Sequence, residues 1–262
     1  MAKPLTVGSL FAGIGGFDLG LERAGMKTAW FCEQNAYCQK VLAKHWPKVP
    51  CYDDVCEIGA HNVKSVDILA GGFPCQDIAT AGKGAGLAGA RSGLWREFAR
   101  LIGELRPSYV IVENVPALRR RGLHKVLQDL DACGYDAEWD GISAAAVGAP
   151  HLRDRLWIVA YTNAGGRNGR PRQIKEAGGG KQPADRGCAA YPDTDSGALR
   201  PWRVGGGAAQ AGGSGWWSVE PPMGRVAYGV PNRLDQLTAL GNALVPQISQ
   251  WIGEQIVAFE NG

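Results

Sequence analysis

The chain has 262 residues, a formal net charge of +3 at pH 7 and a hydrophobic content of 45%. These values exclude a disordered or polybasic chain and allow one large α/β domain plus a small second one. Seven cysteines without a CxxC pair predict neither a disulfide framework nor a metal site. The first residues lack the apolar region of a signal peptide, and no stretch of about 20 apolar residues is present. We therefore expect a soluble cytoplasmic protein with no membrane partner.

Strand and helix patterns alternate along the first 161 residues. The apolar runs predict strands at 5–10, 28–32, 66–70, 109–112 and 155–161, and amphipathic periodicity predicts helices at about 15–24, 36–45, 94–105 and 123–132. Strands this apolar, separated by helices, predict a parallel sheet that is covered on both faces.

The composition changes after residue 161. Fourteen glycines occur in the 55 residues from 161 to 215, without a sustained hydrophobic period. This stretch is too long for a simple loop. Regular structure returns near Val226, and a closing helix is predicted over 245–259 with Pro246 in its first turn. The sequence thus divides into a main domain over 1–161, a small loop-rich region over 162–225, and a return to the main domain over 226–262.

The most informative cysteine is Cys75, in Gly-Gly-Phe-Pro-Cys-Gln at 71–76. It follows the predicted strand 66–70 and precedes a glycine-rich stretch, so it is expected at the carboxyl edge of the sheet, where open α/β sheets bind ligands. The alternative is a small apolar core residue, as most free cysteines are. The framing by Pro74 and two glycines favours a chemical role.

A glycine-rich turn, Phe-Ala-Gly-Ile-Gly-Gly at 11–16, joins the first predicted strand to the first helix. Such turns permit close approach of a nucleotide-type ligand. Glu33 ends the next strand, where a ribose diol would meet a carboxylate. Asp54 lies near the place where a third strand of such a fold is expected, and its carboxylate can accept a hydrogen bond from an adenine amino group there. The alternative for Asp54 is an ordinary surface loop residue.

Three further groups lie at predicted element ends. Glu113 ends the strand expected beside the one that leads to Cys75, and a carboxyl in an apolar wall can keep its proton at neutral pH. Arg153 and Arg155 precede a strand, and alternation places them on one side. Asn242, in Leu-Gly-Asn-Ala at 240–243, is expected to open the closing helix, where it can also act only as a cap.

The order and spacing of these motifs resemble the DNA (cytosine-5) methyltransferases, in the compact form typical of bacteria and their phages. The resemblance covers residues 5 to about 161 and 225 to the end. It implies a Rossmann-like, S-adenosylmethionine-dependent methyltransferase sheet with a small, loop-rich target-recognition domain. It also implies a nucleophilic Cys75, an acid at Glu113 and cytosine-binding arginines at Arg155 and Arg153.

The same resemblance implies a cofactor site and partners. The cofactor is S-adenosylmethionine, and the positions that match the family's binding residues are Phe11, Gly13, Ile14, Gly15, Gly16, Glu33, Gln34, Asp54, Val55, Pro74, Asn242 and Ala243. The implied substrate is cytosine in double-stranded DNA, flipped out of the duplex. A cognate restriction endonuclease is an implied partner, and we expect a monomer.

Other functions stay open at this point. An RNA (cytosine-5) methyltransferase acting on tRNA resembles this chain in every catalytic motif, although that branch typically carries a Cys-Phe-Thr tripeptide that is absent here. A protein that binds S-adenosylmethionine or DNA without turnover is a second alternative, which an intact Cys75 and Glu113 disfavour. A Rossmann oxidoreductase explains neither residue.

Overall fold

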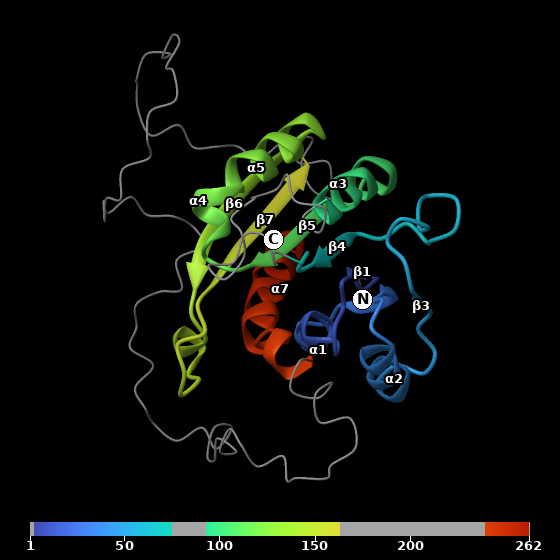
Figure 1. Ribbon diagram of the computed structural model, residues 1–262, viewed down its shortest axis with the longest axis horizontal. Helices are drawn as coiled ribbons and strands as arrows, with labels where there is room; N and C mark the ends of the chain where they lie inside the picture. The colour runs from blue at the N-terminus through green and yellow to red at the C-terminus, as the bar shows by residue number, and fades with distance from the viewer. Residues whose placement is uncertain (1–2, 75–92, 163–238, 262) are drawn as a thin grey trace.

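Residues 3–74, 93–162 and 239–261 are described by a computed structural model of the protein (Figure 1). The first part contains strands β1 to β4 and two helices: β1 (Thr6–Leu10), α1 (Gly16–Arg23), β2 (Lys27–Cys32), α2 (Ala36–His45), β3 (Cys51–Tyr52) and β4 (Ile68–Gly71). The second part continues with α3 (Leu94–Leu105), β5 (Tyr109–Asn114), α4 (Leu118–Arg121), α5 (Leu123–Ala132), β6 (Tyr135–Ile142), the 3₁₀ turn η2 (Ala144–Val147) and β7 (Arg155–Thr162). The last part contains α7 (Pro246–Asn261).

The seven strands form one mixed sheet in the order β3-β2-β1-β4-β5-β7-β6. Strands β1 to β5 pair in parallel, as expected, but β7 runs antiparallel to both β5 and β6, so the prediction of a fully parallel sheet was wrong. An apolar run indicates that a strand is buried on both of its faces, but it does not indicate whether the strand runs parallel or antiparallel to its neighbours. Only η2 lies between β6 and β7, and this link provides no crossover helix of the kind that parallel neighbours need.

Helices cover both faces of this sheet (Figure 1). On one face, α3 and α5 pack their buried side chains on strand residues such as Leu69, Val110 and Ile158. On the other face, α1 and α7 pack on Val7, Ile111 and their neighbours. Successive residues of β5 thus enter different cores, as strand geometry requires. This is the two-faced α/β architecture that the sequence predicts.

Helix α7 returns the end of the chain to its beginning by packing against α1 (Figure 1). Gly20 permits this contact, because a Cβ there would lie 2.0 Å from Ser249 Oγ and 2.2 Å from the Pro246 carbonyl oxygen. The Ser249 hydroxyl donates to the carbonyls of Pro246 and Gly16. Any side chain at position 20 would therefore separate the two helices.

The predicted element bounds are close to the observed ones, and α3, α2 and α5 coincide with them. Two strands have no counterpart in the sequence prediction, namely the two-residue β3 and the mixed-polarity β6. The region predicted at 162–225 lies outside the described residues except for residue 162. No helix among the described residues is long and apolar enough to cross a membrane.

The carboxyl group of Asp18, in α1, is fully buried between this helix and the sheet. It accepts hydrogen bonds from the hydroxyls of Ser9 (2.9 Å) and Thr28 (3.2 Å). Burial raises its pKa to about 7, and the two hydroxyls only partly oppose that shift. Since the pKa in the folded state exceeds the unfolded value, Asp18 favours folding at low pH and loses this contribution as the pH rises towards 7.

We therefore expect Asp18→Asn to stabilise the protein more at pH 8 than at pH 5. At about 1.36 kcal/mol per pKa unit, the gain in unfolding free energy should increase by about 2–3 kcal/mol between these pH values. Urea unfolding of both proteins at pH 5 and pH 8 measures the difference. An equal effect at the two pH values would contradict a buried, protonatable Asp18.

Candidate active site

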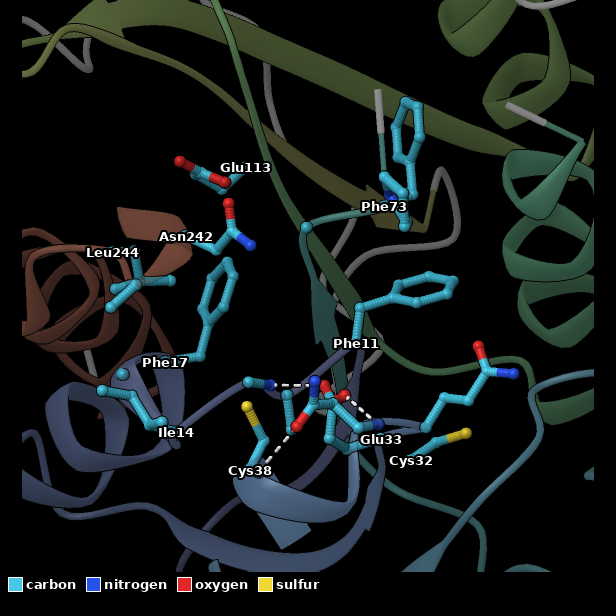
Figure 2. Close-up of a pocket in the computed structure, with 18 of the residues that line it drawn as sticks. Phe11, Ile14, Phe17, Cys32, Glu33, Cys38, Phe73, Glu113, Asn242 and Leu244 are labelled. Carbon is cyan, nitrogen blue, oxygen red and sulfur yellow. Dashed lines mark hydrogen bonds between the residues drawn. The ribbon is translucent and has the colours of Figure 1, made fainter. Parts of the chain in front are cut away.

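The carboxyl ends of β1, β2, β4 and β5 border a cavity of about 500 Å³, the size range of small-molecule sites. Figure 2 shows Glu33 at one end of this cavity and Glu113 with Asn242 at the other. Aromatic rings, including those of Phe11, Phe17 and Phe73, form much of its apolar wall. The cavity therefore has two polar ends joined by an apolar middle.

The glycine-rich turn forms the first polar end together with Glu33. Gly13 has a φ of +56° and space around its Cβ position, so the turn requires glycine there for conformation and leaves room for a ligand. One carboxylate oxygen of Glu33 accepts from the Gly13 N–H at 2.7 Å, and the other accepts from the Asn35 N–H at 2.7 Å. A carboxylate has about four acceptor sites, so two remain for ligand hydroxyls.

The loop after β3 lines the same end of the cavity with Asp54 and Val55. Asp54 is exposed, and one of its carboxylate oxygens accepts from the Cys56 N–H at 2.8 Å. Val55 is buried and packs in the core next to α3. An acidic side chain and a buried apolar one thus line the cavity next to Glu33, whose N–H donates to the Tyr52 carbonyl at the end of β3.

The second polar end is an ion pair between Glu113 and Arg155. The Nε of Arg155 lies 2.9 Å from Oε1 of Glu113, and the two side chains are only 22% and 13% exposed. Burial raises the pKa of Glu113 above its usual range, although Arg155 and Arg153 oppose the shift. The pair exists because β7 is antiparallel: its first residue lies beside the last residues of β5. A parallel β7 would have placed Arg155 at the opposite edge.

Asn114 connects the end of β5 to the segment that leads to Cys75. Its buried side-chain amide donates to the Phe73 carbonyl at 3.1 Å, and its side-chain oxygen accepts from the Val115 N–H at 2.8 Å. Nearby, a Cβ at Gly72 would lie 2.9 Å from Oε2 of Glu113. The backbone that precedes Pro74 is therefore fixed closely against the Glu113 carboxylate.

Arg153 has a different position from its neighbour Arg155. It precedes β7 and has a φ of +20°, so strand alternation does not apply to it. Its guanidinium donates to the carbonyls of Gly241, at 2.9 Å, and Ala243. These carbonyls flank Asn242, which lines the cavity. Arg153 thus holds the C-terminal segment against the site rather than lining the cavity itself.

Asn242 does not open the closing helix, contrary to the prediction. Residues 239–242 are helical, residues 243–245 are not, and α7 begins at Pro246. Asn242 therefore ends a separate helical turn. Its position in the cavity follows from the carbonyls that Arg153 holds.

Most of the predicted site residues border this one cavity. Those that line it are Phe11, Gly13, Ile14, Gly16, Glu33, Gln34, Asp54, Val55, Pro74, Glu113, Arg155, Asn242 and Ala243. Gly15 does not line it; this residue has a φ of +84° and its Cβ position faces Trp46. Cys75 lies outside the described residues, directly after the cavity-lining Pro74.

Several lining residues were not predicted from the sequence, among them Phe17, Cys32, Asn35, Cys38, Asn114 and Leu244. Most are ordinary apolar or capping residues, and only their proximity to the recognised turns marks them. Asn114 had a signal, because it directly follows Glu113 at a strand end. Burial raises the pKa of Cys32 to about 12, so this lining thiol is not a nucleophile at neutral pH.

A family model described as C-5 cytosine-specific DNA methylase matches residues 5–182. The chain belongs to this family. Among curated proteins, the Type II methyltransferase M2.BsuMI of Bacillus subtilis is 37% identical over 164 residues, which are 60% of this chain and 42% of that protein. The Type II methyltransferase M.HhaI of Haemophilus parahaemolyticus is 31% identical over 158 residues, which are 59% of this chain and 48% of that protein. The matched region thus spans about half or less of these relatives.

Solved structures support the methylase fold. A putative DNA modification methyltransferase encoded within an Escherichia coli prophage is 27% identical, with a TM-score of 0.53 over 61% of this chain and 47% of that chain. The Dnmt2 methyltransferase of Schizosaccharomyces pombe is 19% identical, with a TM-score of 0.51 over 61% of this chain and 49% of that chain, and shows likeness of fold alone. The Rossmann-like methyltransferase sheet predicted from the sequence is confirmed.

Proposed function

We propose that this protein transfers a methyl group from S-adenosylmethionine to carbon 5 of cytosine in duplex DNA. The observation that supports this most strongly is the partly buried Glu113–Arg155 pair, which shares one cavity with the glycine turn, Glu33 and the segment before Cys75. One polar end thus suits a nucleoside cofactor and the other suits a pyrimidine edge. The family match and the Type II methyltransferase relatives agree with this assignment.

The residues at the first polar end fit the cofactor. The open space at Gly13 admits close backbone approach, Glu33 has acceptor capacity left for the ribose hydroxyls, and Asp54 offers a carboxylate to the adenine amino group. Phe11, Val55 and Leu244 supply apolar contact. When bound, the cofactor supplies an electrophilic methyl group on a sulfonium.

The second polar end prepares cytosine for reaction. Carbon 5 of cytosine is a weak nucleophile until the Cys75 thiolate adds to carbon 6 and forms a carbon–sulfur bond. Glu113, whose pKa is raised by burial, is suited to share its proton with ring nitrogen 3 as that bond forms. Arg155 is suited to hold the carbonyl oxygen at carbon 2, which draws electron density out of the ring. Carbon 5 then becomes an enamine carbon able to accept the methyl group.

Release reverses the addition. Loss of the carbon 5 proton to a base re-forms the ring double bond and breaks the carbon–sulfur bond, so the Cys75 thiolate leaves and the proton on nitrogen 3 returns to Glu113. The Glu113 side chain is only 13% exposed and lines the cavity at the carboxyl ends of the strands, so a base stacked in an intact duplex could not contact it. The target cytosine must therefore rotate out of the helix.

Several finer expectations accompany this proposal. Region 162–225 is proposed to read the DNA sequence, since its Arg, Lys, Asn and Gln residues are the types that contact base edges. We also propose that the protein acts as a monomer in the cytoplasm, with a cognate restriction endonuclease as partner. Binding of the purified protein to DNA of different sequences, without cofactor, tests the proposed role of region 162–225. Gel filtration tests the monomeric state.

Glu33→Ala is expected to weaken cofactor use far more than chemistry. Removing two charge-assisted acceptor positions should raise the KM for S-adenosylmethionine by about 10- to 100-fold while kcat changes little. Steady-state methylation with varied cofactor measures both constants. Glu57→Ala, which removes an exposed carboxylate from outside the cavity, is the matched control. A loss confined to kcat would contradict the ribose role.

The chemical outcome is tested by digesting methylated duplex DNA to nucleosides and separating them by mass spectrometry. The proposal requires the methylated product to be 5-methyl-2′-deoxycytidine. Methylation on an exocyclic amino group of cytosine or adenine would contradict the role given to Cys75 and Glu113.

A further inference from the structure

Arg100 of α3 makes an unusual set of contacts for a surface helix residue. Its Nε bonds to Glu97 at 2.7 Å and its Nη1 to Glu104 at 2.8 Å, one helical turn away on either side. Its Nη2 donates to two backbone carbonyls, those of Val55 at 3.0 Å and Ile58 at 2.9 Å. Each of the three guanidinium nitrogens of Arg100 therefore donates at least one hydrogen bond, and the side chain is only one-third exposed.

The two carbonyls belong to the loop that carries Asp54. This loop is also fixed by Glu104, whose second carboxylate oxygen accepts from the Ala60 N–H at 3.2 Å. The side chains of Val55 and Ile58 are buried in the same core as Phe98 and Leu101 of α3. The loop is therefore held on α3 in two ways: its apolar side chains pack in the core beside the helix, and the Arg100 guanidinium bonds to its backbone carbonyls.

We infer that Arg100 is a positioning residue for the cofactor: its guanidinium, oriented by Glu97 and Glu104, holds the Asp54–Val55 wall of the cavity in the conformation that binds the adenine end. The inference rests on the proposed function. Arg100 does not line the cavity and touches no reacting group. It acts by fixing the backbone immediately after Asp54, the residue proposed to accept from adenine.

The geometry explains why arginine is needed at this position. A guanidinium presents five N–H donors in a rigid planar fork, so it can bond two carboxylates and two carbonyls at once. A lysine ammonium has three donors on a flexible stem and cannot span the same set. The charge of Arg100 also lowers the pKa of Glu104 through their hydrogen bond, which keeps that carboxylate ionised as an acceptor.

The test is calorimetric binding of S-adenosylhomocysteine, the demethylated product of the cofactor, to the full chain. Arg100→Met is expected to raise Kd about tenfold or more, and Arg100→Lys to recover only a small part of that loss. Arg96→Met is the control, because Arg96 lies on the same helix, is exposed and does not line the cavity; its Kd should stay within about twofold. The kcat of Arg100→Met at saturating cofactor should stay within about threefold.

A double-mutant cycle with Asp54→Ala separates positioning from general damage. If Arg100 acts through the Asp54–Val55 wall, Arg100→Met should weaken binding much less when Asp54 is already alanine. Full additivity, or an unchanged Kd in Arg100→Met, would overturn the inference. If Arg100→Met does not fold, Arg100→Lys replaces it in the same cycle. Failure of the unsubstituted protein to bind S-adenosylhomocysteine would instead refute the proposed function.

Discussion

Cys75→Ser is expected to abolish methyl transfer while cofactor binding persists. A serine hydroxyl is almost entirely protonated at neutral pH and is a poor nucleophile, so the addition to carbon 6 stops. We expect the rate to fall by at least about 10³-fold, since loss of the nucleophile of a covalent enzyme can cost on the order of 10⁶ in kcat. Radiolabelled methyl transfer to duplex DNA measures the rate, and calorimetry with S-adenosylhomocysteine measures binding.

Cys133→Ser is the matched control for this substitution. Cys133 is a half-buried free cysteine that follows α5 and does not line the cavity. It should retain nearly full activity. Full activity in Cys75→Ser would eliminate the covalent mechanism, whereas loss of cofactor binding in the same variant would show that the substitution disturbs the site as a whole.

Glu113→Gln should slow methyl transfer by about 10²- to 10⁴-fold, the range over which a positioned acid or base contributes to catalysis. The amide keeps the shape of the side chain and can still accept from Arg155, but it cannot transfer a proton to ring nitrogen 3. The KM for S-adenosylmethionine should change little, since Glu113 lies at the end of the cavity opposite Glu33 (Figure 2). Single-turnover methylation with saturating cofactor isolates the chemical step.

The pH dependence provides a second readout for Glu113. Because burial raises the pKa of Glu113, its protonated form persists to higher pH than that of an exposed glutamate. Activity that needs the protonated acid should therefore decline as the pH rises through the pKa of Glu113, and this decline should be missing from Glu113→Gln. A decline of equal position and size in both proteins would assign it to another group.

The individual residues of the site were largely predictable from the sequence, because each chemical group follows a recognisable strand. The turn at 11–16, Glu33 and Glu113 all come directly after apolar runs, and the carboxyl ends of neighbouring parallel strands meet at one edge. Their order also matches that of a known family. Local pattern and strand direction together were sufficient for these positions.

The contacts that join separate segments were not predictable. The Arg155–Glu113 pair depends on the antiparallel direction of β7, which an apolar pattern does not encode. The Arg153 bonds to the Gly241 and Ala243 carbonyls join positions about 90 residues apart in the chain. Arg100 appears in the sequence as an ordinary charged position on an amphipathic helix. Its role depends on two carbonyls that only the folded loop brings to it.

Methylation of carbon 5 of cytosine in DNA is the activity from which the other predictions follow. The most direct measurement incubates the full chain with labelled S-adenosylmethionine and a mixed-sequence duplex DNA, with tRNA in a parallel reaction, and then maps methylated positions by bisulfite sequencing. If the proposed activity is right, label appears in the DNA, at cytosines within one sequence context. Label confined to tRNA, or absent from both substrates, would contradict it.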